Sequence, residues 1–261
     1  MQEFINTIIH GDCIEEMKKI SDNSVDLIFA DPPYYLQLPK GKRLKRADGS
    51  VIIPVDDYWD QFESYEDYDN FTQDWIMECQ RILKPTGTFW VIGMYHNIFR
   101  VGTIMQNLGL WFLNDVIWIK TDALPNLNGR RFTNNHETII WSVKNKDCKK
   151  YTFNYEFLKK LNGGKQMKDT DWIFGLCRGQ ERLKDENGIK AHPTQKPLKL
   201  IQQILLTASN KGDLVFDPFM GSGTTAVVAE ALGRKWIGIE RDEKYVELAE
   251  KRLKDYIQSK K

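Results

Sequence analysis

The sequence contains few cysteines, and none of them lies in a metal-binding pattern. Cys13, Cys79, Cys148 and Cys177 are far apart, and with the four histidines they give no spacing typical of zinc ligands. Widely separated cysteines are typical of reduced thiols. The sequence therefore predicts a cytoplasmic protein with neither a metal site nor a disulfide framework.

Long apolar runs are absent as well. No segment approaches the ~20 apolar residues that a membrane-spanning helix requires. The N-terminus also lacks the basic region, apolar run and cleavage site of a secretion signal. The sequence thus predicts no membrane partner, and 261 residues are enough to bury a core without help from disulfides or metals.

An excess of charge of one sign is also missing, because the net charge is +1. Such a balance neither supports nor excludes a nucleic-acid partner, so local clusters matter more. Residues 40–46 carry five cations, among them Lys42 and Arg43, and residues 144–150 and 159–168 are rich in lysine. These runs are typical either of solvated loops or of a surface that contacts phosphates, and both interpretations stay open.

What the sequence does contain is a regular alternation of strand-like and helix-like segments. Strands are expected at 25–30, 88–92, 116–119, 138–143, 213–216 and 236–239. Helices are expected at 71–83, 98–108, 197–209, 223–232 and 244–254. This order predicts an α/β fold with a largely parallel sheet and helices on both faces, interrupted by a polar insertion from about 121 to 191.

Residues 214–226 (LVFDPFMGSGTTA) have the pattern of a strand, a glycine-containing turn and a helix. Gly221 and Gly223 allow a ligand to approach the backbone closely. Glu240, at the tip of the next expected strand, is well placed to accept both hydroxyls of a ribose. The pattern predicts a nucleoside cofactor, but not a nicotinamide dinucleotide, because Ala226 stands where that site needs a third glycine.

The tetrapeptide Asp31-Pro32-Pro33-Tyr34 follows the first buried strand directly. An exocyclic amino group of a nucleobase is a poor nucleophile, because its lone pair is delocalised into the ring. The Asp31 carboxylate and the Pro32 carbonyl can accept its two N–H bonds and localise that pair. Tyr34 offers a face on which a flipped base can stack. The motif predicts direct methylation of such an amino group, whereas cytosine C5 chemistry is disfavoured because no cysteine follows a proline.

With DPPY at 31–34 and DPFMGSGTT at 217–225, the chain resembles the β class of amino-group DNA methyltransferases, in which the catalytic motif precedes the cofactor motif. HPTQKP at 192–197 is similar to the family's third cofactor element, and Gly11-Asp12-Cys13 to the element near the cofactor's adenine. FADPPY, DVIWIK, PNLNGRRF, NNHETIIW and KAHPTQKP resemble segments of the HinfI-type adenine methyltransferases that read GANTC. The resemblance spans nearly the whole chain, without the C-terminal extension expected of that type.

The resemblance implies a Rossmann-like S-adenosylmethionine-dependent methyltransferase fold with a circularly permuted motif order. It divides the chain into a catalytic part at 1–120, a target-recognition insertion at 121–190, and a cofactor-binding part at 191–261 that completes the same domain. The implied cofactor is S-adenosyl-L-methionine, and the implied partner is double-stranded DNA. A homodimer and a cognate restriction endonuclease are further implied.

The family's motifs also imply residue roles. The implied catalytic residues are Asp31, Pro32, Pro33 and Tyr34. The implied cofactor residues are Asp12, Cys13, Asp31, Thr194, Lys196, Pro197, Phe219, Gly221, Ser222, Gly223, Thr224 and Glu240. Lys196 is expected to face the cofactor's carboxylate. The expected DNA contacts are Lys42, Arg43, Asn126, Arg130 and Arg131, since arginine pairs with guanine and asparagine with adenine.

Within this class the sequence favours N6 of adenine, because Asp at the first motif position leans toward adenine in the family and Ser toward cytosine. N4 of cytosine follows the same chemistry and stays the alternative. An inactive DNA-binding subunit is disfavoured, since both DPPY and the glycine turn are intact. His136-Glu137 is interpreted either as a structural hydrogen-bonded pair or as a hinge of the recognition loop, and the structural pair is favoured.

Overall fold

The computed structural model describes residues 2–37, 44–45, 51–52, 58–124, 130–166 and 170–260. The strands are β1 (Thr7–His10), β2 (Val25–Ala30), β3 (Leu44–Lys45), β4 (Val51–Ile52), β5 (Leu83–Gly93), β6 (Trp111–Ile119), β7 (His136–Val143), β8 (Asp171–Ile173), β9 (Leu214–Asp217) and β10 (Lys235–Glu240). The helices are α1 (Cys13–Met17), α2 (Tyr65–Ile82), α3 (Ile98–Asn107), α4 (Tyr155–Leu161), α5 (Leu198–Ala208), α6 (Thr224–Ala231) and α7 (Glu243–Gln258). Short 3-10 helices lie at Gln2–Phe4, Tyr58–Asp60 and Gly179–Glu181.

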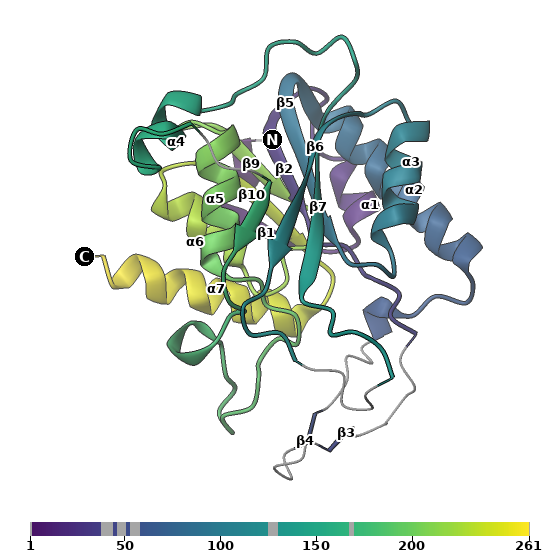
Figure 1. The fold of residues 1–261 in the computed structure, drawn as a ribbon, viewed down its shortest axis with the longest axis vertical. Helices are drawn as coiled ribbons and strands as arrows, with labels where there is room; N and C mark the ends of the chain where they lie inside the picture. The colour runs from purple at the N-terminus through teal and green to yellow at the C-terminus, as the bar shows by residue number, and fades with distance from the viewer. Residues whose placement is uncertain are drawn as a thin grey trace.

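The described strands form one eight-stranded sheet, in the order β1-β10-β9-β2-β5-β7-β6-β8, and a two-stranded pair, β3-β4. In the large sheet, every neighbouring pair is parallel except the two that involve β7. β9 and β10, from the C-terminal part of the chain, lie between β1 and β2, so both ends of the chain build one sheet (Figure 1). The predicted α/β class with a largely parallel sheet is confirmed.

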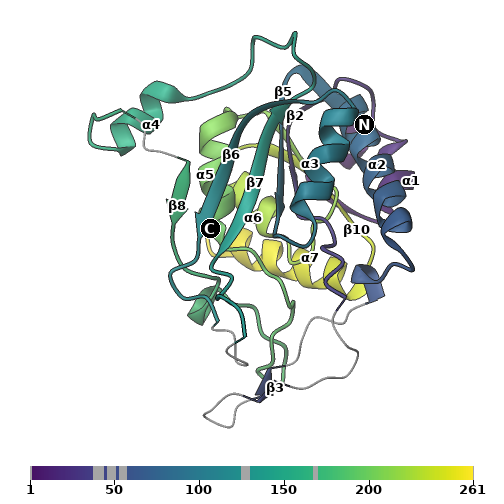
Figure 2. The ribbon, with the colours of Figure 1, turned by 45° about the vertical axis from the view of Figure 1, so that its right-hand side comes forward.

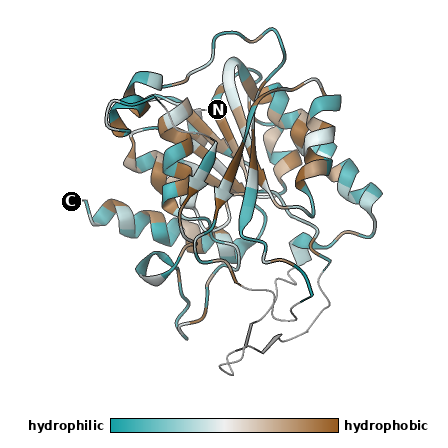
Figure 3. Cartoon of the chain, in the orientation of Figure 1, coloured by the Kyte–Doolittle hydropathy of each residue, from teal (hydrophilic) through white to brown (hydrophobic). Residues whose placement is uncertain are grey.

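Helices cover both faces of this sheet. α1, α2 and α3 pack on one face, and α5 and α6 on the other, with α7 beside α6 (Figures 1 and 2). β2 shows why, since Leu27 and Phe29 face the α5 side while Ile28 and Ala30 face the α2 side. A strand that is apolar on both faces must be covered on both. Figure 3 shows the apolar surfaces of the strands and helices turned toward each other.

The observed elements differ from the expected ones mainly in length. β5 begins at Leu83, which pairs with Val25, five residues before the expected strand at 88–92; the register then shifts before Leu27 pairs with Thr88. α2 begins earlier than expected, because Ser64 caps it by accepting a hydrogen bond from the Asp67 N–H (3.1 Å). β1, α1, α4 and β8 were not expected, since segments of three to seven residues show little periodicity.

The middle of the chain takes part in the sheet. β7 lies inside the range 121–190, yet it pairs with β5 on one side and β6 on the other. The division into parts at 1–120, 121–190 and 191–261 stays a prediction. β7, which falls in the second part, belongs to the eight-stranded sheet. Within the described ranges, no helix has the length and apolar character needed to cross a membrane.

Candidate active site

A pocket lies where the carboxyl ends of four parallel strands meet. Its lining includes Asp12 after β1, Asp31 after β2, Asp217 at the end of β9 and Glu240 at the end of β10. In open α/β sheets, ligands bind at this edge of the sheet, because the loops that follow the strands converge there. The pocket therefore holds four carboxyl groups, together with the cationic side chains of Lys196 and Arg241.

The glycine turn between β9 and α6 forms one side of the pocket. Gly221 has a positive φ of 51°, and a Cβ at this position would lie 3.0 Å from Nε2 of His192. The Gly221 N–H donates to Oε2 of Glu240 (2.8 Å), and the Asp242 N–H donates to Oε1 (2.8 Å). Each carboxylate oxygen accepts two hydrogen bonds. The Arg241 N–H also bonds this carboxylate, so Glu240 keeps one acceptor site for a ribose hydroxyl.

Asp217 holds this turn from inside the fold. Its carboxylate accepts hydrogen bonds from the Phe219 N–H (2.9 Å) and from the hydroxyl of Thr225 (2.5 Å). Burial raises the pKa of Asp217 to about 7, and the nearby carboxylates of Asp31 and Glu240 add to this rise. Asp217 thus fixes the backbone on which Phe219 and Gly221 are mounted.

Aromatic side chains form another wall of the pocket. The ring of Phe219 packs edge-on against Trp75, with the ring centroids 5.3 Å apart. Trp59 also lines the pocket, and its buried Nε1–H has no hydrogen-bond partner among the described residues. Because this N–H is inaccessible from the open pocket, Trp59 contributes ring surface to the wall and no donor. Apolar rings and carboxylate acceptors together suit a nucleoside.

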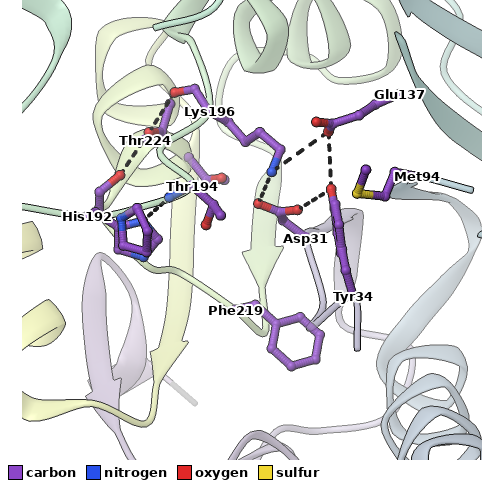
Figure 4. Close-up of polar contacts among 12 residues, drawn as sticks. Asp31, Tyr34, Met94, Glu137, His192, Thr194, Lys196, Phe219 and Thr224 are labelled. Atoms are coloured by element: carbon purple, nitrogen blue, oxygen red, sulfur yellow. Dashed lines mark hydrogen bonds and ion pairs between the residues drawn. The ribbon is translucent and has the colours of Figure 1, made fainter. Parts of the chain in front are cut away.

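A cluster of charged side chains surrounds Asp31 (Figure 4). Nζ of Lys196 lies 2.6 Å from Oδ2 of Asp31, and the hydroxyl of Tyr34 donates to Oδ1 (2.9 Å). The same hydroxyl lies 3.1 Å from Oε2 of Glu137, and Nζ of Lys120 lies 2.6 Å from Oε1 of Glu137. Two carboxylates and two ammonium groups therefore alternate in one buried network.

The network sets the charge states of its members. Burial raises the pKa of Asp31, while the Lys196 ammonium opposes this rise and the Glu137 carboxylate adds to it. Burial alone would also raise the pKa of Glu137, but the ammonium groups of Lys196 and Lys120 together hold this pKa below its usual value. Burial alone would lower the pKa of Lys196, but the carboxylates of Asp31 and Glu137 raise this pKa above its usual value. Lys196 and Glu137 are therefore charged, and Asp31 can both accept a hydrogen bond and take up a proton.

The loop that carries Tyr34 is held by Asp60. The N–H groups of Tyr34 and Tyr35 donate to Oδ1 of Asp60 (2.6 and 2.7 Å), and the Leu36 N–H donates to Oδ2 (2.8 Å). Tyr35 has a positive φ of 50°, which a tyrosine rarely adopts, so three charge-assisted hydrogen bonds stabilise a strained turn. The hydroxyl of Tyr68 donates to the Pro33 carbonyl (2.9 Å) and fixes the other end of the motif.

Residues 192–197 form the loop that presents Lys196. The amide of Gln195 donates to the Glu181 carbonyl (2.8 Å) and accepts from the Leu183 N–H (3.0 Å), which fixes the loop to the preceding segment. Burial and neighbouring cations lower the pKa of His192 to about 3, so its ring is neutral. Nδ1 of His192 accepts from the Thr194 N–H (3.3 Å), so that Nε2 carries the ring proton at the pocket.

The structure brings most of the expected site residues together. Of the expected cofactor residues, all but Pro197 and Gly223 line the pocket, and of the catalytic motif Asp31 and Pro33 do. Pro197 caps α5, and Gly223 caps α6. Two of these residues also make contacts that the sequence does not predict. Lys196, which lines the pocket, pairs with Asp31, and the Tyr34 hydroxyl lies within hydrogen-bond distance of two carboxylates. Their expected roles toward the cofactor and the base stay predictions.

Of the expected DNA contacts, Arg130 and Arg131 lie outside the pocket lining. Arg130 and Arg131 are exposed, and Nη1 of Arg131 donates to the hydroxyl of Tyr95 (2.7 Å). Lys42, Arg43 and Asn126 lie outside the described residues.

Several residues of the site were not foreseen from the sequence. They include Lys120, Asp60, Glu137 and Trp59. Glu137 was interpreted as half of a structural pair with His136, whereas its carboxylate contacts Tyr34 in the catalytic motif. The one available signal was its place at the start of an expected strand, next to an apolar run.

The permuted α/β sheet, the nucleoside pocket and the Asp31 cluster beside it define a class of enzyme, the methyltransferases that modify amino groups. A family model for N6 and N4 methyltransferases, described as DNA methylase, matches residues 25–251. The chain belongs to this DNA methylase family.

Two curated relatives agree with this assignment. The chain is 53% identical over 257 residues to the type II methyltransferase M.HinfI of Haemophilus influenzae. This match covers 98% of the chain and 70% of M.HinfI. The chain is also 41% identical over 246 residues to the type II methyltransferase M2.LlaDCHI of Lactococcus lactis subsp. cremoris, covering 94% of this chain and 88% of that enzyme.

Solved structures match the fold over nearly the whole chain. The complex of M1.HpyAVI with S-adenosylmethionine is 26% identical, with a TM-score of 0.67, and the match covers 95% of this chain and 98% of that one. The cytosine-N4-specific PvuII DNA methyltransferase, at 22% identity, a TM-score of 0.70 and coverage of 96% and 90%, shares the fold. The protein is an S-adenosylmethionine-dependent DNA methyltransferase.

The pocket fits this cofactor on its own chemistry. Phe219 and Trp59 offer aromatic surface for a purine, and Glu240 offers an acceptor for a ribose. Gly221 leaves room that a side chain would fill, since its Cβ would press on His192. When bound, S-adenosylmethionine supplies a methyl group activated by a positive sulfonium.

Proposed function

We propose that this chain methylates N6 of an adenine that is flipped out of duplex DNA, at sites of the GANTC type. The observation that carries the proposal is the position of Asp31. Its carboxylate lines the same pocket as Phe219, Gly221 and Glu240 of the nucleoside site. A base amino group bound to Asp31 would therefore lie beside the cofactor.

Asp31 is equipped to orient such an amino group. Each of its oxygens already accepts one hydrogen bond, from Tyr34 or Lys196, and keeps capacity for another. The Lys196 ammonium favours the ionised carboxylate, which is the form that accepts an N–H. After methyl transfer the amino nitrogen carries an extra proton, and Asp31, with its raised pKa, is the acceptor placed to receive it.

The preference for adenine and for GANTC rests on the resemblance to the HinfI-type enzymes. The identity of 53% with M.HinfI over 98% of this chain supports it, as does aspartate at position 31. We place the reading of bases in the parts of 121–190 that flank β7, with Arg130 and Arg131 as contacts. Within 191–261, the expected cofactor residues from Thr194 to Glu240 are proposed to bind S-adenosylmethionine.

The resemblance further supports a homodimer and a cognate restriction endonuclease as partners. The type II names of both relatives agree with an endonuclease partner. A DNA substrate also agrees with the cytoplasmic location expected from the sequence. Size-exclusion chromatography with light scattering tests the dimer directly.

Methyl transfer from labelled S-adenosylmethionine to matched duplexes, with and without GANTC, tests the proposal. We expect N6-methyladenine confined to the duplex that contains GANTC, identified by nucleoside analysis. A duplex with adenine replaced by 2-aminopurine at the target position is the control for flipping. N4-methylcytosine as the product would overturn adenine as the target base. N6-methyladenine at another sequence would overturn GANTC as the recognition sequence.

A further inference from the structure

Glu137 occupies an unusual position for a residue outside the known motifs. It is 8% exposed, lies near the start of β7, and pairs across the sheet with Trp118. Because β7 runs antiparallel to β5, its first residues lie at the edge where the parallel strands end. The sheet thus delivers a buried carboxylate to the catalytic motif from a strand beyond β5 (Figure 4).

The hydroxyl of Tyr34 lies between two carboxylates. It is 2.9 Å from Oδ1 of Asp31 and 3.1 Å from Oε2 of Glu137. A tyrosine hydroxyl has one hydrogen to donate, so the two carboxylates compete for it. When Tyr34 donates to Glu137, Oδ1 of Asp31 no longer shares its charge with that hydroxyl and accepts the base amino group more strongly.

The ammonium groups stabilise this arrangement. Nζ of Lys120 lies 2.6 Å from Oε1 of Glu137, while Nζ of Lys196 lies 2.6 Å from Oδ2 of Asp31 and 3.9 Å from Oε2 of Glu137. The side chains of Lys120, Lys196 and Glu137 are each about nine-tenths buried. Two positive and two negative charges balance, which a buried ionic cluster requires.

We propose that Glu137 is a positioning residue for methyl transfer, which takes over the Tyr34 hydroxyl and anchors Lys196 so that Asp31 is free to bind the target amino group. Lys120 compensates the charge of Glu137. This inference deepens the proposed function and rests on it, since Asp31 must be the group that holds the base.

Replacing Glu137 with glutamine in the full chain tests the inference. The variant E137Q keeps the size of the side chain but loses its charge and its strength as an acceptor for Tyr34. We expect kcat to fall about tenfold or more, because a misplaced catalytic group costs rate. KM for S-adenosylmethionine should stay within about twofold, because Glu137 does not line the cofactor pocket.

The pH profile separates this role from a merely structural one. The charged and titratable groups that face Asp31 are Lys196, Glu137, Tyr34 and, from β9, Asp217. The negative charge of Glu137 raises the pKa of Asp31, so its removal lowers that pKa. Activity requires ionised Asp31 and is lost as pH falls through its pKa. In E137Q the acidic limb of kcat is therefore expected to move to lower pH, by about half a unit or more.

A matched control is Glu78→Gln, which breaks the ion pair of Glu78 with Arg81 (2.6 Å) on α2. It should leave both kcat and the acidic limb unchanged. If E137Q does not fold, as judged by thermal unfolding, the double variant E137Q/K120Q removes one charge of each sign and keeps the balance. The double variant should show the same lowered kcat and the same shifted limb.

The outcomes separate the two proposals. A folded E137Q or E137Q/K120Q variant with the kcat and pH profile of the wild type overturns the positioning role. A fall in kcat with an unshifted acidic limb also overturns it, since that result indicates only lost structure. Failure of the wild-type chain to methylate adenine in GANTC duplexes overturns the proposed function instead. Lowered kcat together with the shifted limb supports the inference.

Discussion

Replacing Asp31 with asparagine is expected to lower the rate of methyl transfer by about 10³-fold or more, because it removes a preorganised charged acceptor from the reacting amino group. The asparagine side chain has nearly the same size, but only its oxygen accepts a hydrogen bond, and it carries no charge. It also leaves the buried Lys196 ammonium with Glu137 as its remaining anionic partner, at 3.9 Å. Single-turnover transfer from labelled S-adenosylmethionine measures the rate.

Cofactor binding distinguishes loss of chemistry from loss of structure in this variant. We expect the Kd for S-adenosylmethionine, measured by titration calorimetry, to stay within about tenfold, because the other walls of the pocket are untouched. The matched control is Asp26→Asn. Asp26 lies on β2, the strand that Asp31 follows, and also pairs with a lysine, Lys84 at 2.7 Å, but it does not line the pocket. Near-normal turnover of the Asp31 variant would refute the assignment of Asp31 as the residue that holds the base.

Replacing Gly223 with alanine is expected to destabilise the fold by about 3 kcal/mol. About 1 kcal/mol comes from the left-handed backbone at φ 74°, and about 2 kcal/mol from overpacking. A Cβ on Gly223 would lie 2.8 Å from Cβ of Ala249 in the middle of α7, so the two helices would have to separate. Since α6 begins at this residue, we also expect weaker binding of S-adenosylmethionine. Urea unfolding and titration calorimetry measure the two effects.

Gly212→Ala is the control that separates backbone strain from the clash. Gly212 has a similar positive φ of 87°, but a Cβ there would have no neighbour within 4 Å. This variant should therefore lose only about 1 kcal/mol and bind the cofactor normally. Equal losses in the two glycine variants would show that contact between α6 and α7 at Gly223 contributes nothing.

The sequence predicted those parts of the molecule that are encoded by contiguous residues. β2 was predicted with its observed bounds, because a short apolar run ends just before two prolines. In the structure most residues of this run are fully buried. The residues of the glycine turn and of the 192–197 loop were found for the same reason, since each motif is one unbroken segment. Their convergence at one sheet edge follows from the parallel order of β9, β10 and β2.

Residues that reach the site from other elements could not be predicted in this way. Asp60 acts on backbone groups 24 to 26 positions earlier in the chain. Glu137 and Lys120 act through the register of β6 and β7, which the sequence alone does not specify. Polar residues at the ends of apolar strands resemble ordinary strand termini. Only the pairing of the strands shows that Glu137 meets Tyr34.

β7 is antiparallel to both of its neighbours, so β6 and β7 form a hairpin. The segment that connects the two strands lies at the catalytic edge of the sheet. The Lys120 N–H donates to the Asn135 carbonyl (2.6 Å) and closes the stem of the hairpin, while the side chains of Lys120 and Glu137 sit on that stem. The segment joining the two strands can therefore vary in length or sequence without moving the register of the sheet. Under the proposed function, this segment reads the bases. Strain from an ill-fitting DNA sequence would then reach Lys120 and Glu137 before Asp31, so fidelity can be enforced during chemistry as well as during binding.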